Sequence, residues 1–420
     1  MDHPLRALPV SFQKGQPIGI TSVCSAHPIV IEAALRLSKE QGAPALIEAT
    51  CNQVNQDGGY TGMTPRDFRI FVENIAEKVG FDPANLILGG DHLGPNPWRH
   101  LPADQAMQKA EAMIAAFAEA GFTKLHLDTS MGCLGEATAL PDAWTAERAA
   151  RLAAIAEQRK CPGPDPVYVI GTEVPVPGGA VEELDHLKIT TPQDAAQSYA
   201  IHRQAFEQRG LSKAFSRVIA LVVQPGVEFG HSDVVRFDPA KADALSASLM
   251  DMPGIVFEAH STDYQTTAAL SQLVQMGFAI LKVGPWLTFA LREALYALDP
   301  LADILEGHPP RGDLMGVMEA IMIEAPDNWQ KYYAGDKMDL WLQRHFSMSD
   351  RIRYYWPHPK AEAAVARLRS RLAGKKAPET ALSQYLNGLA IDNSNLDADS
   401  ILIAAVQKVL RQYAVATGLN

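Results

Sequence analysis

The sequence is poor in several features that would mark a specialised class of protein. Its 420 residues include only four cysteines, Cys24, Cys51, Cys133 and Cys161, and no two of them form a C-x-x-C pair. A zinc ribbon or a thioredoxin-like motif is therefore not expected. Cys24 and Cys51 lie in apolar runs, so we expect buried free thiols in a reducing cytosol.

Long apolar runs and an excess of positive charge are also missing. The longest runs, such as Ile219–Val223, are far too short to span a bilayer. The first residues, Met1–Gln16, contain prolines and charges but no apolar core of a signal peptide. Acidic residues outnumber basic ones by 48 to 37, which gives a formal net charge of -11. We therefore expect a cytoplasmic protein that binds neither nucleic acid nor membranes.

Three common functional motifs do not occur. No G-x-x-x-x-G-K-[ST] loop is present, and Gly374-Lys375-Lys376 lacks both its leading glycine and its Ser/Thr. A serine nucleophile elbow and a dinucleotide fingerprint are likewise missing. These absences argue against a kinase, a serine hydrolase and a dinucleotide-dependent enzyme.

What the chain does contain is a repeated alternation of short apolar runs with helical segments, from about Ile18 to Ala290. Such alternation predicts a parallel sheet with right-handed crossovers. Eight units favour a closed (β/α)8 TIM barrel, with an open doubly wound sheet as the alternative. The expected strands are Ile18–Ala26, Ala45–Asn52, Leu86–His92, Lys124–Ser130, Val167–Val174, Arg217–Gln224, Ile255–Thr262 and Ala279–Gly284.

After Ala290 the strand pattern stops and helical patterns continue. We expect the barrel to comprise residues 1–290 and a helical extension, residues 291–420, to pack on it. Aromatic residues concentrate around Tyr354–Trp356. They either pack the extension on the barrel or form a lid or a partner surface.

The carboxyl ends of the expected strands are unusually polar, and these ends carry the functional groups of parallel barrels. Side chains alternate along a strand, so residues two apart share a face. Buried charge is costly unless it is paired or bound to a ligand. We therefore predict a ligand site at this rim, although satisfied core groups are the plainer alternative. The residues concerned are Glu48, Thr50, Asn52, Lys124, His126, Asp128, Ser130, Glu173, Glu258, His260 and Lys282.

Histidines after three of these strands suggest a metal site. His92 follows Asp91 at the end of the third strand, and His231 and His260 follow the sixth and seventh. If the three imidazoles converge, they fit a catalytic zinc site with one open position. Hydrogen bonding within the rim is the alternative, and both interpretations remain open.

Two loops could hold a phosphate group. Lys282 and Gly284 end the eighth strand and lead into a helix, and barrels often bind phosphate at such helix starts. Gly178 and Gly179, after Glu173, could form a second loop that approaches a ligand closely.

At these residues the chain resembles the non-catalytic subunit family of class II tagatose-1,6-bisphosphate aldolases, some members of which have been labelled tagatose-6-phosphate kinases. The similarity covers nearly the whole chain, including the extension. It is carried by Gly19–Pro28, Ile47–Gln53, Asn55–Pro65 (NQDGGYTGMTP), Gly89–Trp98 (GGDHLGPNPW), His126–Cys133 (HLDTSMGC), Gly171–Gly179 (GTEVPVPGG), Gln224–His231 (QPGVEFGH), Phe257–Tyr264 (FEAHSTDY) and Ser347–Trp356 (SMSDRIRYYW).

The resemblance implies a TIM barrel that supports the activity and stability of a catalytic aldolase subunit. By position, Asp91 and His92 look like the aldolase's acid and first zinc ligand. Gly171–Gly179 looks like its glutamate-containing glycine loop, and Lys282–Thr288 like its phosphate-binding strand end. Glu228 and Glu258 lie near the places of two histidine ligands, and a mixed His/Glu set would still bind a divalent ion.

These considerations define one set of candidate residues and three hypotheses. The protein is expected to be an accessory subunit that binds a catalytic class II aldolase subunit and a sugar phosphate, in galactitol or N-acetylgalactosamine catabolism. The alternatives are a stand-alone metal-dependent ketose or ketose-phosphate aldolase or C4 epimerase, and a structural scaffold; a homo-oligomer is left open. Candidate catalytic residues are Asp91, Asp128 and Glu173; candidate substrate-binding residues are Glu48, Asn52, Gly178, Gly179, Ser261, Lys282 and Gly284; candidate metal ligands, for zinc, are His92, His231, Glu258 and His260.

Overall fold

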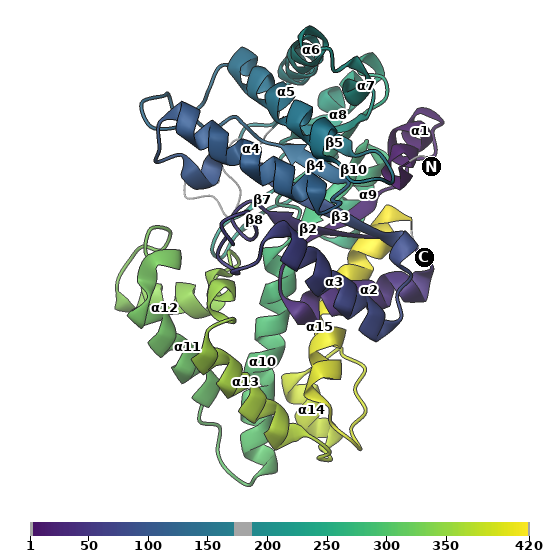
Figure 1. The fold of residues 1–420 in the computed structure, drawn as a ribbon. Helices are drawn as coiled ribbons and strands as arrows, with labels where there is room; N and C mark the ends of the chain where they lie inside the picture. Colours follow the sequence, from purple (N-terminus) through teal and green to yellow (C-terminus); the bar gives the residue numbers. More distant parts are fainter. Residues whose placement is uncertain (1–2, 172–186, 419–420) are drawn as a thin grey trace.

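The computed structural model describes residues 3–171 and 187–418. Within these residues eight parallel strands close into a barrel in the order β1-β10-β9-β6-β5-β4-β3-β2, which confirms the predicted TIM barrel (Figure 1). The strands are β1 (Ile20–Cys24), β2 (Ala45–Thr50), β3 (Leu86–Leu93), β4 (Lys124–Leu127), β5 (Val167–Ile170), β6 (Val218–Val223), β9 (Val256–Ala259) and β10 (Phe278–Val283). A short hairpin, β7 (Glu228–Phe229) and β8 (Val234–Val235), follows β6.

The helices around the barrel begin and end where the sequence signals them. Thr64 caps α3 with a reciprocal bond to Asp67, and Pro65 takes the first helical position. Gly42 and Gly80 end α2 and α3 in the left-handed conformation, which a residue without Cβ adopts readily. These helices are α2 (Pro28–Gln41), α3 (Pro65–Val79), α4 (Ala103–Glu119), α5 (Asp142–Arg159), α6 (Pro192–Gln208), α7 (Ser212–Phe215), α8 (Pro239–Ala247) and α9 (Thr267–Gln275).

The expected boundary at residue 290 falls inside one long helix, α10 (Pro285–Leu305). This helix starts at the end of β10 and carries the chain away from the barrel into the extension (Figure 1). The extension contains α11 (Asp313–Glu324), α12 (Lys337–Phe346), η7 (Arg351–Tyr355), α13 (Pro359–Leu372) and α14 (Glu379–Tyr385), with a short turn η6 (Pro326–Asn328).

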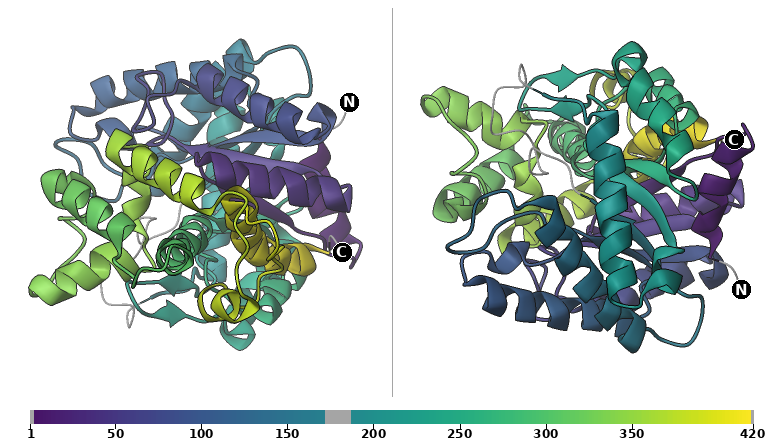
Figure 2. Two further views of the ribbon diagram at one scale, coloured as in Figure 1. Left: turned by 90° about the horizontal axis from the view of Figure 1, so that it is seen from below. Right: turned by 90° about the horizontal axis from the view of Figure 1, so that it is seen from above.

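The last helix, α15 (Ala398–Thr417), returns to the barrel and lies beside α2 (Figures 1 and 2). Gln407 donates to the carbonyl of Ala33 at 3.2 Å. The carbonyl of Thr417 accepts from the backbone N–H of Gly19, just before β1. The extension is therefore inserted between two helices that both belong to the ring around the barrel.

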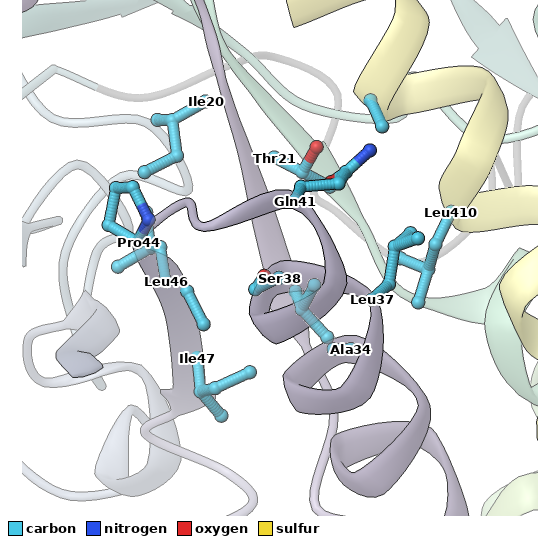
Figure 3. Close-up of a pocket in the computed structure, with 13 residues that line it drawn as sticks. Ile20, Thr21, Ala34, Leu37, Ser38, Gln41, Pro44, Leu46, Ile47 and Leu410 are labelled. Carbon is cyan, nitrogen blue, oxygen red and sulfur yellow. The ribbon is translucent and has the colours of Figure 1, made fainter. Parts of the chain in front are cut away.

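The amino-terminal end of the barrel is filled with aliphatic side chains. Leu5 and Leu8, from η1 (Pro4–Arg6) and α1 (Ala7–Gln13), pack against Ile20, Leu46 and Ile87 at the starts of three strands. Just outside, a cavity of about 40 Å³ lies between α2, the first two strands and α15. Figure 3 shows that its wall is mainly aliphatic. It carries no cluster of ionisable groups, and we regard it as a packing gap.

Over the described residues, no helix combines the length and the apolar character needed to cross a membrane.

Candidate functional site

The centre of the barrel mouth is a buried lysine–carboxylate cluster, formed by Glu48, Asp91, Lys124, Glu258 and Lys282. The Lys124 ammonium group lies 2.6 Å from Glu48 and 2.7 Å from Glu258. Lys282 pairs directly with Asp91 and lies 3.7 Å from Glu48 and 3.8 Å from Glu258. Five strands therefore contribute one charge each to a single connected network.

The sheet register explains how these side chains meet. Glu48 of β2 is the register partner of Gly89 of β3. A Cβ atom on Gly89 would come within 2.6 Å of a Glu48 carboxylate oxygen, so only glycine leaves room for this carboxylate. Glu258 of β9 pairs with Ile280 of β10, two residues before Lys282. The period of two then places Lys282 on the same inward face.

Mutual pairing keeps the two lysines of the network charged despite their burial. Burial opposes charge, but Glu258 and Glu48 raise the pKa of Lys124. Burial likewise opposes charge at Lys282, and Asp91 leads the carboxylates that raise its pKa. Nucleophilic lysines of Schiff-base enzymes need a depressed pKa. Both ammonium groups therefore fit electrostatic roles and do not fit Schiff-base chemistry.

Beside this network three imidazoles form a second group, the imidazole cluster of His92, His126 and His260. The ring centroids of His92 lie 4.9 Å from those of both His126 and His260, and the latter two are 5.4 Å apart. One ligand atom from each imidazole and one from Asp91 all lie within 4.8 Å of one another. Three imidazoles and a carboxylate form a donor set that suits zinc and similar divalent ions.

His92 is oriented as a metal-binding histidine would be. Its Nδ1 lies 2.8 Å from Asp128, and its Nε2 lies 3.6 Å from Asp91. A carboxylate that holds one ring nitrogen, and so directs the other toward the ion, is the usual second partner of a ligating histidine. The His92 interaction also lowers the pKa of Asp128, although burial acts to raise it. Asp128 therefore acts on His92 as an ionised carboxylate.

Both ring nitrogens of His126 already have hydrogen-bond partners. Its Nδ1 lies 3.0 Å from Asp91 and 3.2 Å from the backbone nitrogen of His92, and its Nε2 lies 3.0 Å from the carbonyl of Gly171. Burial would lower the pKa of His126, but the hydrogen bond with Asp91 raises it. His126 must exchange one of these bonds to become a ligand.

The charge balance of the mouth also suits a divalent cation. The carboxylates of Glu48, Asp91, Asp128 and Glu258 outnumber the two ammonium groups by two when the imidazoles are neutral. His260 is held in that neutral form, because burial and then Lys282 lower its pKa to about 3. The described donors thus match such an ion in type, in proximity and in charge.

Backbone strain concentrates at the same rim. His92, Ser261 and Tyr264 have φ values of 49°, 51° and 63°, in the left-handed region that such residues rarely adopt. Each such residue costs about 1–3 kcal/mol, and strain of this kind gathers at functional sites. Here the strained residues are His92, near the end of β3, and Ser261 and Tyr264, which follow β9.

A second carboxyl pair, Glu228 and Asp263, lies at the rim. Burial raises the pKa of Glu228 to about 7, even though the Phe229 N–H and the Ser261 hydroxyl donate to it at 2.9 and 3.2 Å. Burial also raises the pKa of Asp263 to about 6, and the charge of Asp263 adds to the increase at Glu228. Carboxyl groups that titrate near neutrality suit proton transfer.

The structure brings most of the predicted site residues together. Glu48, Asp91, His92, Asp128, Glu258, His260, Ser261 and Lys282 all lie at the mouth. Asn52 is exposed beyond the end of β2. Glu173, Gly178 and Gly179 lie outside the described residues.

His231 and Gly284 are placed differently from the expectation. His231 lies against the extension, where its Nδ1 is 3.0 Å from the Ser347 hydroxyl and its Nε2 is 3.1 Å from the Tyr332 carbonyl. With both ring nitrogens engaged, it is not part of the imidazole cluster. The Gly284 N–H, expected to meet a phosphate group, donates to Asp263 at 3.1 Å.

Sequence reasoning placed Lys124 and His126 on the polar face of their strand but did not select either as a site residue. Alternation along β4 was the signal for both. Glu228 begins the two-residue strand β7 and Asp263 stands in a loop, and neither segment is long enough in a regular period to fix the direction of a side chain.

Known proteins resemble this chain over nearly its whole length. A family model for the D-tagatose-1,6-bisphosphate aldolase subunit GatZ/KbaZ-like family matches residues 5–418. A D-tagatose 6-phosphate 4-epimerase of Agrobacterium fabrum is 54% identical over 417 residues, covering 99% of this chain and 98% of that protein. The D-tagatose-1,6-bisphosphate aldolase subunit GatZ of Klebsiella pneumoniae is 48% identical over 407 residues, 96% of each chain.

A solved structure is similarly related. It is a Sinorhizobium meliloti protein described as a probable tagatose 6 phosphate kinase, with 57% identity and a TM-score of 0.87. The match covers 95% of this chain and all of that one. Proteins with three different descriptions therefore share this fold and much of this sequence.

Proposed function

The chain belongs to the GatZ/KbaZ-like family of D-tagatose-1,6-bisphosphate aldolase subunits, and on that premise we propose that it is itself an enzyme, a 4-epimerase of 6-phosphorylated ketoses. The observation that carries the proposal is the set of acid–base groups and metal-competent imidazoles at one barrel mouth. Buried carboxyl groups with a pKa near neutrality, beside a cluster of imidazoles, are typical of a catalytic site and are not needed by a structural scaffold. The relative named as a 4-epimerase supports the choice of reaction.

The chemistry of C4 explains how an aldolase family could supply an epimerase. In a 2-ketose, C4 is not adjacent to the carbonyl carbon, so its C–H proton is not acidic. The C4 hydroxyl group is instead in the aldol position. Removal of its proton lets the C3–C4 bond break, and the electron pair moves onto the C2 carbonyl as an enediolate while C4 becomes an aldehyde. Rotation of the aldehyde, re-formation of the bond and return of the proton give the C4 epimer with no net change in atoms.

Particular residues suit each part of this sequence. Glu228, with a pKa near neutrality, is suited to take the C4 hydroxyl proton and return it. The ammonium groups of Lys282 and Lys124 can balance the negative charge that develops on the enediolate. A divalent cation held by His92, His126 and His260 with Asp91 would polarise the substrate carbonyl. The same residues would hold the enediolate fragment until the bond re-forms.

The test is direct conversion by the purified chain without a partner. D-tagatose 6-phosphate supplied with a divalent metal should yield D-fructose 6-phosphate, followed by ¹³C NMR. Dihydroxyacetone and glyceraldehyde 3-phosphate, the fragments of C3–C4 cleavage, should not accumulate. Accumulation of both fragments would indicate an aldolase, and absence of turnover with any divalent metal would remove the enzyme hypothesis. An ATP-containing control tests the kinase description, which the missing phosphate loop disfavours.

A second candidate function, support of a catalytic aldolase subunit, rests on an exposed apolar stripe of α12. Met338, Leu342 and Phe346 stand four residues apart and are 62%, 45% and 45% exposed. Spacing of four places them on one helical face, and such a stripe suits a protein contact. Co-expression with a class II aldolase subunit should raise that subunit's activity, and Leu342→Glu should abolish the gain. An unchanged partner activity would contradict this role.

A further inference from the structure

The extension carries two arginines, Arg351 and Arg353 of η7, that form no ion pair with any residue the structure describes. Both guanidinium groups lie near the ring of Tyr354, with Arg351 5.1 Å and Arg353 4.4 Å from its centroid, and Arg351 is nearer still to the ring of Tyr332, at 3.4 Å. The nearby carboxylate of Asp350 is already bound by Thr288 at 2.6 Å and Arg292 at 3.1 Å. Two neighbouring cations without a carboxylate are costly unless an anion joins them.

The ring of Tyr354 lies against a loop of the barrel mouth. Tyr354 packs edge-on against Tyr60, with ring centroids 4.9 Å apart, and Tyr60 stands in the loop that follows β2. The path of that loop requires glycine at position 59, because φ there is 56° and a Cβ atom would come within 2.4 Å of the Gln53 carbonyl oxygen. The Tyr264 hydroxyl donates to the Met348 carbonyl at 2.6 Å and so holds the segment that precedes η7 against the rim.

Of the two arginines, Arg353 is the one whose charge influences the pKa values of groups at the barrel mouth. Burial raises the pKa of Asp263, and the positive charge of Arg353 is among the influences that lower it. The same charge opposes the increase that burial and Tyr354 cause in the pKa of Tyr60. Arg353 donates to the Ser349 and Asp350 carbonyls and to the Tyr354 hydroxyl. These bonds use three of its five N–H groups, and the described residues leave two for a ligand.

Barrels often bind an anion at the start of the helix that follows the last strand, but in this chain a carboxylate of the protein occupies that position. The backbone N–H groups of Gly284 and Trp286, at the start of α10, both donate to one oxygen of Asp263, at 3.1 and 2.8 Å. A phosphate group could use these donors only by displacing Asp263, which has no alternative partner of this quality among the described residues. The guanidinium of Arg353, whose charge acts on Asp263, is a neighbouring cation that can receive it.

We propose that Arg353, supplied by the extension, binds the phosphate group of a phosphorylated ketose whose carbonyl end lies at the barrel mouth. This assignment rests on the proposed function for the identity of the sugar. A guanidinium matches a phosphate group through two parallel hydrogen bonds. Tyr60 and Tyr354 flank it, so the insertion between α10 and α15 contributes directly to substrate selection.

The test compares binding of three probes to the full chain by isothermal titration calorimetry: D-tagatose 6-phosphate, unphosphorylated D-tagatose and inorganic phosphate. Arg353→Met should weaken binding of the sugar phosphate by about 10- to 100-fold, as expected for loss of charge-assisted hydrogen bonds. Binding of free tagatose should not change, and binding of inorganic phosphate should weaken. Arg353→Lys should restore part of the affinity. Arg367→Met, at an exposed position of α13, is the matched control and should behave as wild type.

Several outcomes would overturn the assignment. Equal affinity of wild type and Arg353→Met for the sugar phosphate would do so, as would equal losses for phosphorylated and free tagatose, or no binding of any phosphate probe to wild type. A melting temperature within a few degrees of wild type for Arg353→Lys guards against simple misfolding. Arg353-dependent binding without turnover would contradict the proposed reaction but uphold the phosphate site. Turnover that is unchanged in Arg353→Met would uphold the proposed reaction but contradict the phosphate site.

Discussion

The two ends of this barrel are built from the same eight strands and are filled in opposite ways. At the amino-terminal end, Leu5 and Leu8 pack with Ile20 and Leu46 in an aliphatic layer. At the carboxyl end, lysines, carboxylates and imidazoles are buried within one cluster, and three residues adopt strained backbone conformations. The first arrangement stabilises by removing apolar surface from water. The second is hard to explain by stability, because buried charges at best offset the cost of their own desolvation.

This contrast implies that one end of the strands serves stability and the other end serves catalysis. Substitutions at the aliphatic end should change the free energy of unfolding and leave catalysis intact. Substitutions at the charged end should change catalysis by more than they change stability. The insertion between α10 and α15 belongs with the charged end, since its η7 segment is held against the rim by Tyr264.

The largest expected effect is the loss of activity in His92→Ala. Removal of an imidazole held by Asp128 at 2.8 Å should lower kcat/KM by about 1000-fold or more, as expected for loss of a metal ligand and its transition-state stabilisation. The melting temperature should fall by only a few degrees, because alanine keeps the left-handed backbone already present at this position and only one rim side chain is lost. Steady-state kinetics and thermal unfolding measure the two quantities. Wild-type turnover in this variant would break the contrast between the two ends.

The next effect is structural. Leu8→Ala removes a side chain that is 4% exposed and should lower the free energy of unfolding by about 2–5 kcal/mol. Its kcat/KM at 25 °C should equal that of wild type. Urea unfolding followed by tryptophan fluorescence provides the first number. A large loss of activity in a variant that is still folded would show that the aliphatic end contributes to the chemistry.

A pH-dependent effect sharpens the comparison at Glu228. Its folded pKa of about 7 lies above its ordinary value of 4.5, so its contribution to stability is fully present below about pH 4.5 and is lost as the pH rises through 7. Glu228→Gln removes the charge that develops at high pH. The variant should gain on the order of 2–3 kcal/mol relative to wild type between pH 5 and pH 8.5.

Chemical denaturation at both pH values measures this gain, and the same variant should lose turnover if Glu228 moves the C4 hydroxyl proton. A stability difference that does not depend on pH would mean that Glu228 titrates normally. Glu306→Gln, an exposed substitution in the extension with an ordinary ion-pair role, serves as the comparison and should show no gain at high pH.

The smallest effect is expected where α15 meets α2 on the surface. Arg411 and Glu40 form an ion pair at 3.0 Å, with side chains 51% and 58% exposed. Arg411→Ala should cost less than about 1 kcal/mol, because exposed pairs are screened by water and salt. Thermal unfolding at low and high salt would measure it. A larger loss would mean that this contact, and not the buried face of α15, holds the extension's return helix.

The sequence predicts those parts of the molecule in which side chains follow a regular period. The alternation of apolar runs and capped helices predicted all eight barrel strands, and alternation within strands placed Glu48, Glu258 and Lys282 on one inward face. It could not predict that α15 returns to the barrel, because that contact depends on tertiary packing. It also could not orient His231 or Arg353, since no period sets the direction of a side chain in a loop or a short turn.

The central claim is that the imidazole cluster at the charged end binds a divalent cation. Protein treated with a chelator and then titrated with Zn²⁺ by isothermal titration calorimetry tests it most directly. Wild type should bind one ion per chain, His92→Ala should bind at least 100-fold more weakly, and Arg367→Met should bind as wild type does. No stoichiometric binding by wild type, or equally tight binding by His92→Ala, would contradict it.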